Sequence, residues 1–234
     1  MPYSPSLASS TVIVSYVIWG TGVPLACFVM TLWLYRTATL GVPAAPTLPS
    51  VFLPLGPCGQ GSFGIILLGR TVRHLSYLHG SNLTIGIAAD AGATHSNIAD
   101  AIYAGGLVTG LILWGLGLCW YTLAFAMTIN HVIKKENRTF FHPAKFSVGL
   151  WALTFPIGVF ATATNILATE LESPAFRVIG AFLSAQVALH WLYVAAFTAL
   201  KAANGSIFAA PEVAKYNGDI PRRFGTLERD PEMQ

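Results

Sequence analysis

The sequence has 234 residues, of which 54% are hydrophobic and only 10% are charged. A soluble domain carries about 25% charged residues, so this supply of charge cannot cover a surface that faces water. The same composition excludes an intrinsically disordered chain, which has little apolar surface to bury. Together with a mean hydropathy of +0.60, these figures predict an all-α integral membrane protein that crosses the bilayer several times.

Apolar segments recur along the chain at the length that a bilayer requires, which is about 20 residues for a helix. The first segment ends before Arg36, and the second follows a proline-rich linker and ends at Arg70. The third is longer than a bilayer requires, so we expect it to tilt or to project from the membrane. The five predicted spans are residues 11–35, 51–69, 98–133, 146–169 and 178–200. They predict a transmembrane domain over residues 1–201, followed by a polar tail, 202–234, that we expect to be disordered.

Basic residues are distributed unevenly between the two sides of these spans. Ten of the 13 Lys and Arg residues fall on the side that holds the C-terminal tail. The positive-inside rule places that side in the cytoplasm and the N-terminus outside. Residues 71–97 then form an outer loop, in which Asn82-Leu-Thr is a candidate N-glycosylation sequence.

Metal binding and disulfide formation have little support in the sequence. The potential metal ligands of the outer loop are His74, His79, Asp90 and His95. Their spacing fits no compact set of ligands. The three cysteines are Cys27, Cys58 and Cys119. They lie in apolar stretches without a CxxC pair, which predicts small packing residues. We therefore expect no metal and no cofactor.

The second span contains a high density of helix-breaking residues. Residues 52–64 read Phe-Leu-Pro-Leu-Gly-Pro-Cys-Gly-Gln-Gly-Ser-Phe-Gly, with two prolines and four glycines. Proline removes a backbone donor, and a membrane tolerates the freed carbonyl where protein or a water-filled cavity satisfies it. This pattern predicts a kinked helix that lines a pore, although close packing through small residues would explain it too. The candidate pore residues in this span are Gly56, Pro57, Gly59, Gln60, Gly61 and Ser62.

A second break is predicted in the fourth span, where Thr154, Phe155 and Pro156 stand near the middle. A proline kink can turn the preceding side chain toward an axis, so Phe155 could plug a pore. Alternatively, Phe155 is an ordinary core or lipid-facing residue. The third and fifth spans lack a central proline, and the third carries Gly106 and Gly110 at the spacing of a helix-packing motif. We therefore expect broken inner helices to alternate with outer, supporting helices.

The chemistry of the spans favours passive transport over catalysis. No span has a charged residue in its interior, and Asp100 lies at the edge of the third. Charges inside a membrane mark proton relays, so their absence disfavours a proton-coupled pump, whereas a neutral pore suits a weakly bound anion. Common hydrolase, metalloprotease and nucleotide-binding motifs are absent from the sequence, as is a basic and aromatic platform for nucleic acids. We predict a transport protein, not an enzyme, with no nucleic-acid partner.

Three stretches resemble fungal sulfite efflux pumps. Residues 51–65 resemble the seventh helix of these pumps, residues 11–25 the sixth, and residues 146–160 the ninth. The run Leu-Pro-Leu-Gly-Pro-Cys-Gly-Gln-Gly at 53–61 is specific to this branch, whereas Thr-Phe-Pro is shared more widely. The pumps belong to the tellurite-resistance/dicarboxylate transporter family, with the malic acid transporters and the plant slow anion channels. The likeness covers most of residues 10–200.

The resemblance implies a ten-helix protomer of five helical hairpins, in which odd-numbered helices line a pore and full-length protomers assemble as homotrimers. The five spans would be helices six to ten, so the sequence would be the C-terminal half. Phe155 would then be the residue that occludes the pore. The implied function is efflux of sulfite, or of a related small anion, across the plasma membrane. Two alternatives stay open: a C4-dicarboxylate (malate) transporter of the same family, and a membrane fragment or scaffold that transports nothing.

Overall fold

The computed structural model describes residues 5–41, 43, 45–79, 95–133, 146 and 148–205. The long elements of this part are α1 (Pro5–Leu40), α2 (Leu55–His79), α3 (His95–Ile133), α4 (Trp151–Glu170) and α5 (Pro174–Ala203). Two 3-10 helices, η1 (Ala45–Phe52) and η4 (Val148–Leu150), precede α2 and α4. Five helices are long and apolar enough to cross a membrane, which confirms the all-α, five-span prediction.

The first helix extends beyond its predicted span because a charged residue marks the edge of a bilayer and not the end of a helix. α1 continues past Arg36 to Leu40. The next residue is Gly41, whose φ of 83° is a left-handed conformation that glycine adopts at little cost and that stops the helix. The amide of Gly41 donates to the carbonyl oxygen of Thr37 at 3.0 Å, which satisfies one of the last carbonyl groups of the helix.

The predicted outer loop, residues 71–97, is wrong at both ends. α2 passes Arg70 and ends at His79, and α3 begins at His95, so residues 71–79 and 95–97 are helical. Residues 71–79 contain neither proline nor glycine, so nothing in them stops the helix. Asn82 lies outside the described residues, as does most of the predicted tail, so glycosylation and tail disorder stay predictions.

The prolines of the second span mark the start of α2 instead of breaking it. Pro54 lies in the turn between η1 and α2, and Pro57 lies in the first turn of the helix. The N–H groups of a first turn have no partner within the helix, so a proline there removes no hydrogen bond. The predicted span is therefore interrupted at residues 53–54, before α2, while α2 itself continues to His79. Prolines do lie inside two other α-helices, Pro24 in α1 and Pro156 in α4.

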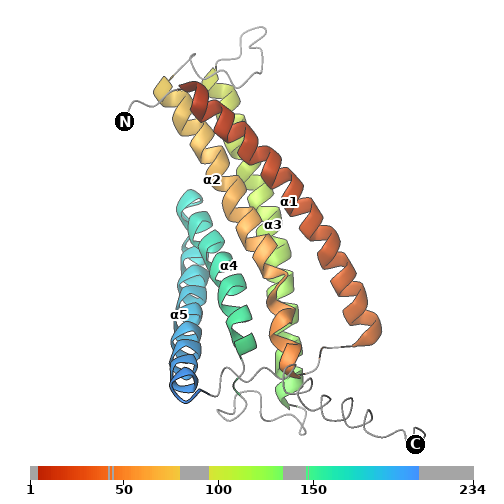
Figure 1. Cartoon of the computed structure of the whole chain (residues 1–234). Helices are drawn as coiled ribbons and strands as arrows, with labels where there is room; N and C mark the ends of the chain where they lie inside the picture. The colour runs from red at the N-terminus through yellow and green to blue at the C-terminus, as the bar shows by residue number, and fades with distance from the viewer. Residues whose placement is uncertain are drawn as a thin grey trace, which may run out of the picture. The chain divides into compact units, whose positions relative to one another are not determined.

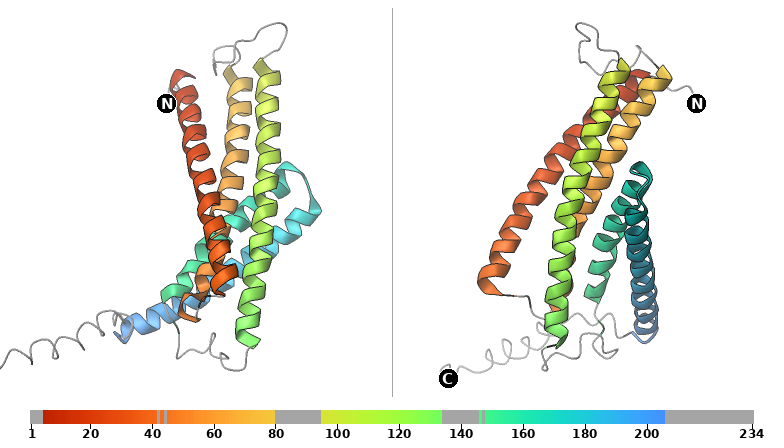
Figure 2. Two further views of the ribbon diagram at one scale, coloured as in Figure 1. Left: turned by 90° about the vertical axis from the view of Figure 1, so that its right-hand side faces the viewer. Right: turned by 180° about the vertical axis from the view of Figure 1, so that it is seen from behind.

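α2 is the central helix of the described bundle. Figures 1 and 2 show it alongside α1 and α3, and it packs mainly on α3, then on α4 and α1. In its most apolar stretch 61% of the residues are buried, compared with 44% in α4, 28% in α3 and 6% in α1. From α1 to α4, the less buried helices α1 and α3 alternate with the more buried helices α2 and α4, in the order predicted for outer and inner helices.

Glycines allow α2 to approach its neighbours closely. A Cβ atom on Gly106 of α3 would lie 2.9 Å from the carbonyl oxygen of Ile65 in α2, and one on Gly110 would lie 2.5 Å from Cγ1 of the Ile66 side chain. A Cβ atom on Gly59 of α2 would lie 2.7 Å from the backbone nitrogen of Phe160 in α4. Real Cβ atoms do not approach other atoms this closely. The packing role predicted for Gly106 and Gly110 is therefore confirmed.

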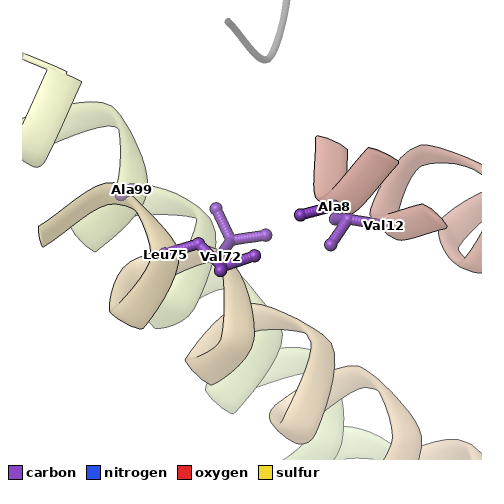
Figure 3. Packing of buried hydrophobic residues seen from close by; sticks show 5 residues of the cluster. All are labelled: Ala8, Val12, Val72, Leu75 and Ala99. Carbon is purple, nitrogen blue, oxygen red and sulfur yellow. The ribbon is translucent and has the colours of Figure 1, made fainter. Parts of the chain in front are cut away.

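The extension of α2 beyond Arg70 is held by packing against the beginnings of α1 and α3. The buried cluster at this end consists of Ala8, Val12, Val72, Leu75 and Ala99. Figure 3 shows Ala8 and Val12 of α1 facing Val72 of α2. This contact fixes the end of α2 as part of the bundle.

The chain divides into two compact units, Met1–Trp191 and Leu192–Gln234. The first unit contains α1 to α4 and the beginning of α5. In the second unit, the rings of Tyr193 and Phe197 pack with their centroids 4.7 Å apart. All the contacts that concern the candidate site lie within the first unit.

Candidate functional site

The two motifs that stand out in the sequence meet at the beginnings of α2 and α4. A Cβ atom on Gly56 would lie 3.7 Å from Cε1 of Phe155. Gly56 belongs to the Leu-Pro-Leu-Gly-Pro run and Phe155 to the Thr-Phe-Pro run. The structure therefore brings two candidate pore residues, far apart in the sequence, into one place.

The side chain of Phe155 projects away from the core of the first unit. It is 64% exposed, whereas Phe160, further along α4, is only 1% exposed. The ring of Phe160 stacks on that of Trp114 in α3, with the centroids 5.7 Å apart. The aromatic core residue of α4 is thus Phe160, and the contacts of Phe155 within this chain do not support a core role for it.

The backbone and side chain next to Phe155 include polar groups without partners. Pro156 is buried and has no N–H, so it cannot complete the helical hydrogen bond to the carbonyl of Ala152. The buried Oγ1 of Thr154 has no hydrogen-bond partner among the described residues. The first turns of α4, which carry Phe155, thus lack the helical hydrogen bond that residue 156 would donate.

Three of the six candidates in α2 take part in helix packing. Gly59 lies against the backbone of α4. Ser62 is fully buried, and its hydroxyl donates to the carbonyl oxygen of Gly110 in α3 at 2.7 Å. The carbonyl oxygen of Gly61 accepts a hydrogen bond from Nε1 of Trp19 in α1 at 2.9 Å. At these three positions the structure favours the packing explanation that the sequence left open.

Of the other three candidates, Gly56 is buried and Pro57 is half-buried. Gln60 is exposed, and within the described ranges its amide group makes no hydrogen bond. Together with Pro57 it lines a groove of about 620 Å³ between α1 and α2. Gln60 follows Gly56, which lies beside Phe155, by one helical turn.

At the opposite ends of α2 and α4, charged side chains link the two helices. Nη1 of Arg70 lies 3.2 Å from Oε1 of Glu170, the last residue of α4. The hydroxyl of Tyr103 in α3 donates to Oε2 of the same carboxylate at 2.5 Å. The Arg70 side chain is 58% exposed and the Glu170 side chain 12% exposed. Sequence reasoning missed this pair, although the similar distances from Gly56 to Arg70 and from Phe155 to Glu170 along the chain could have indicated it.

A second ion pair at this end links α2 to α3. Nε of Arg73 lies 2.8 Å from Oδ1 of Asp100, and the hydroxyl of Tyr77 donates to Oδ2 of the same carboxylate at 3.0 Å. The guanidinium of Arg73 also lies over the ring of Tyr103, 4.9 Å from its centroid. Asp100 is thus at the edge of its span, as predicted, and it is paired there.

No metal centre is found in the described part of the chain, where no three His, Cys, Asp or Glu side chains could share an ion. Asp90 lies outside that part. The cysteines are not paired: Cys58 is buried, Cys27 is half-buried and Cys119 is exposed. The predicted packing role therefore fits Cys58 and is wrong for Cys119.

The chain is similar to several curated transporters. It is 35% identical over 202 residues to the sulfite efflux pump SSU1 of Arthroderma benhamiae, an alignment that covers 85% of this chain and 47% of the pump. The pump of the same name from Trichophyton rubrum is 34% identical, with the same coverage. An uncharacterized transporter of Methanocaldococcus jannaschii is 24% identical over 198 residues, which are 85% of this chain and 48% of that protein. The chain spans about half the length of the curated relatives it matches. No solved structure matches it.

The profile of the voltage-dependent anion channel family, SLAC1, matches residues 1–199, which include α1 to α4 and most of α5. The family and the named relatives are channels and transporters. Five apolar helices of spanning length identify the chain as a multi-pass membrane protein. The chain therefore belongs to the voltage-dependent anion channel (SLAC1) family.

Proposed function

We propose that this chain forms part of a transporter that moves sulfite out of the cell, through a neutral pore in the plasma membrane. The observation that carries the proposal is the 35% identity, over 85% of the chain, to a protein named as a sulfite efflux pump. The run at residues 53–61, which resembles the sulfite branch of the family, supports the same substrate.

The geometry at Phe155 supports a gate. The ring is exposed and lies beside Gly56 at the start of α2. An apolar ring in a narrow neutral pore blocks ions by excluding water, and no ion pair has to be broken when it moves.

Selectivity for an anion does not require a charged side chain at this point of the path. α2 and α4 both begin beside the Gly56–Phe155 contact. The N-terminal end of a helix carries a partial positive charge of roughly half an elementary charge. The amide of Gln60 adds a neutral hydrogen-bond donor. Such groups attract an anion weakly enough to release it, which conduction requires.

The gate is tested by Phe155→Ala in cells that produce the protein from its complete gene. We expect anion current per molecule to rise, because the smaller side chain no longer excludes water from the path. The matched control is Phe28→Ala, because Phe28 of α1 is also exposed, at 70%, but is far from the motif in the sequence. Protein abundance is measured in parallel. Unchanged or lower current per molecule in Phe155→Ala would show that Phe155 is not the gate.

The substrate is tested by the release of sulfite and of malate from loaded cells that lack their own exporters. Sulfite release that depends on the protein is the expected result. Release of malate without sulfite would favour the dicarboxylate alternative, and release of neither would favour a scaffold. The plasma membrane location is checked by fractionation of the same cells.

Orientation and assembly belong to the same proposal. The distribution of basic residues predicts that the segment between α2 and α3 faces outward. A cysteine introduced by Ser81→Cys should then react with an impermeant reagent in intact cells, and protection there would reverse the orientation. The resemblance implies a homotrimer, which the mass of the purified complex would verify.

A further inference from the structure

Two contacts show that α2 and α4 run side by side in the same direction. Gly56 and Phe155 meet where the helices begin, and Arg70 and Glu170 meet where α4 ends. Arg70 follows Gly56 by 14 residues, and Glu170 follows Phe155 by 15. At 1.5 Å per residue, these intervals correspond to about 21 and 22 Å, most of the thickness of a bilayer core.

Arg70 lies on the side of α2 that faces α4, as its pairing with Glu170 shows. It follows Gly59 by 11 residues, about three helical turns, so both residues lie on nearly the same side of the helix. Phe155, at one end of the contact between the two helices, is 64% exposed, and the side chain of Arg70, at the other end, is 58% exposed. The open edge of this contact, here called the strip, therefore begins beside Phe155 and has Arg70 at its far end.

We infer that Arg70 attracts the transported anion at the end of the path opposite Phe155, and that Glu170 positions the guanidinium there and offsets part of its charge. The inference rests on the proposed function, because it requires that the anion path follow this strip. If the predicted orientation is correct, Arg70 stands at the outer mouth.

The chemistry of the pair fits this role. Guanidinium presents five N–H donors in a planar fork that matches oxyanions, and only Nη1 of Arg70 contacts Glu170. The exposed part of the side chain keeps its other donors available. A positive charge at the mouth of a pore raises the local concentration of anions, and salt screens this effect. The mostly buried Glu170 is in turn fixed by the hydroxyl of Tyr103.

The Arg73–Asp100 pair provides a matched control within the same molecule. It stands at the same end of α2, with an N–O distance of 2.8 Å and side chains that are 45% and 42% exposed. It joins α2 to α3, however, and lies away from the strip. Any general effect of surface charge or of a lost ion pair would affect both pairs.

The experiment measures the uptake of radiolabelled sulfite from the side of Arg70, at concentrations well below saturation, with the protein produced from its complete gene. We expect Arg70→Gln to lower uptake and Glu170→Gln to raise it, each by about threefold at low salt, the scale of a single partly screened charge. Arg70→Lys, which keeps the charge, should leave uptake close to that of the parent protein. Arg73→Gln and Asp100→Asn should change uptake much less, because Arg73 reaches Glu170 only through the ring of Tyr103, and the effects at Arg70 and Glu170 should shrink in high salt.

The opposite changes in uptake expected for Arg70→Gln and Glu170→Gln distinguish attraction of the anion from a purely structural link between α2 and α4. If the pair only held the helices together, Arg70→Gln and Glu170→Gln would both break it and change uptake in the same direction. That outcome, or equal effects at Arg70 and Arg73, would overturn the inference. If the parent protein moves no sulfite, the proposed function fails instead. If Phe155→Ala raises the current but the Arg70 and Glu170 variants have no effect, only the present inference fails.

Discussion

α1 and α2 are both apolar and long enough to cross a membrane, but they differ in how much of each is buried. Only 6% of the most apolar stretch of α1 is buried, compared with 61% for α2. Large apolar side chains of α1 are exposed along its whole length, among them Val17, Leu25, Phe28 and Leu32. α2 instead presents Gly59 and Ser62 to its neighbours.

The difference shows what determines an interior position in a bilayer. Lipid is as apolar as leucine, so burying a large apolar side chain between helices gains little, and close packing through small residues decides which helix becomes central. A glycine alone is not sufficient. Gly20 and Gly22 of α1 have nothing within 4 Å of the position where a Cβ atom would stand, whereas Gly59 of α2 lies against a backbone.

The largest expected effect tests this contrast with one substitution in each helix. Gly59→Leu places a side chain where the backbone of Phe160 lies 2.7 Å from the Cβ position, so α2 and α4 must separate. Overpacking costs about 1 to 3 kcal/mol when side chains can move, and more is expected against a backbone. Folded protein should therefore be largely lost in Gly59→Leu and retained in Gly20→Leu. Fluorescence-detected size exclusion of tagged variants measures both. Equal amounts of folded protein in the two variants would show that close packing at Gly59 does not distinguish α2 from α1.

An intermediate effect is expected from removing a large side chain in each helix. Ile66 of α2 is fully buried and Ile18 of α1 is 66% exposed. In soluble proteins Ile→Ala in a core costs about 2 to 5 kcal/mol, and here we expect about 2 because the transfer from water is missing. Ile18→Ala should cost less than about 0.5 kcal/mol, the scale of a surface substitution. Thermal unfolding in one detergent measures both changes. A large loss in Ile18→Ala would mean that its face is covered in the assembled protein.

The sequence predicted the number and kind of the helices because composition and length alone decide whether a segment can cross a bilayer. It did not predict where they end. Arg36 and Arg70 mark the edge of the apolar region, while the ends of the helices depend on Gly41 and on the packing of Val72. The break predicted for the second span lies just before α2 and not within it, because proline costs little in the first turn of a helix, and residue types do not show where the first turn lies.

The candidate site was predictable only in part. The density of glycine and proline identified α2 and α4, and the structure brings Gly56 and Phe155 together. The same residue types serve packing at Gly59 and Ser62, and only the neighbours of each face distinguish the two uses. The link between Arg70 and Glu170 depends on the relative register of two helices, which no local pattern in the sequence contains.

The smallest expected effect concerns hydroxyl groups, which α1 and α2 both carry. Ser62 donates to the carbonyl oxygen of Gly110 in another helix at 2.7 Å, whereas Thr21 of α1 donates to Val17 in its own helix at 2.8 Å. The bond within α1 also forms when that helix is alone in the bilayer, so it does not contribute to assembly. The bond of Ser62 forms only when α2 and α3 meet. The carbonyl of Gly110 can still accept from its own helix after the hydroxyl is removed, so no group is left unpaired.

Ser62→Ala should therefore cost about 0.6 to 1 kcal/mol, the size of an interhelical hydrogen bond in a membrane, and Thr21→Ala should cost about zero. The difference between the two variants is measured by unfolding in mixed micelles of increasing denaturing detergent. The double variant Ser62→Ala with Gly110→Ala serves as the check. A Cβ atom on Gly110 would lie 2.5 Å from Cγ1 of Ile66 and 3.4 Å from the carbonyl oxygen of Ser62, so we expect its substitution to displace α2 there and to reduce the effect of losing the Ser62 hydroxyl. If Ser62→Ala costs as much in that background as in the parent, the hydroxyl acts elsewhere, and the polar contact does not contribute to the central position of α2.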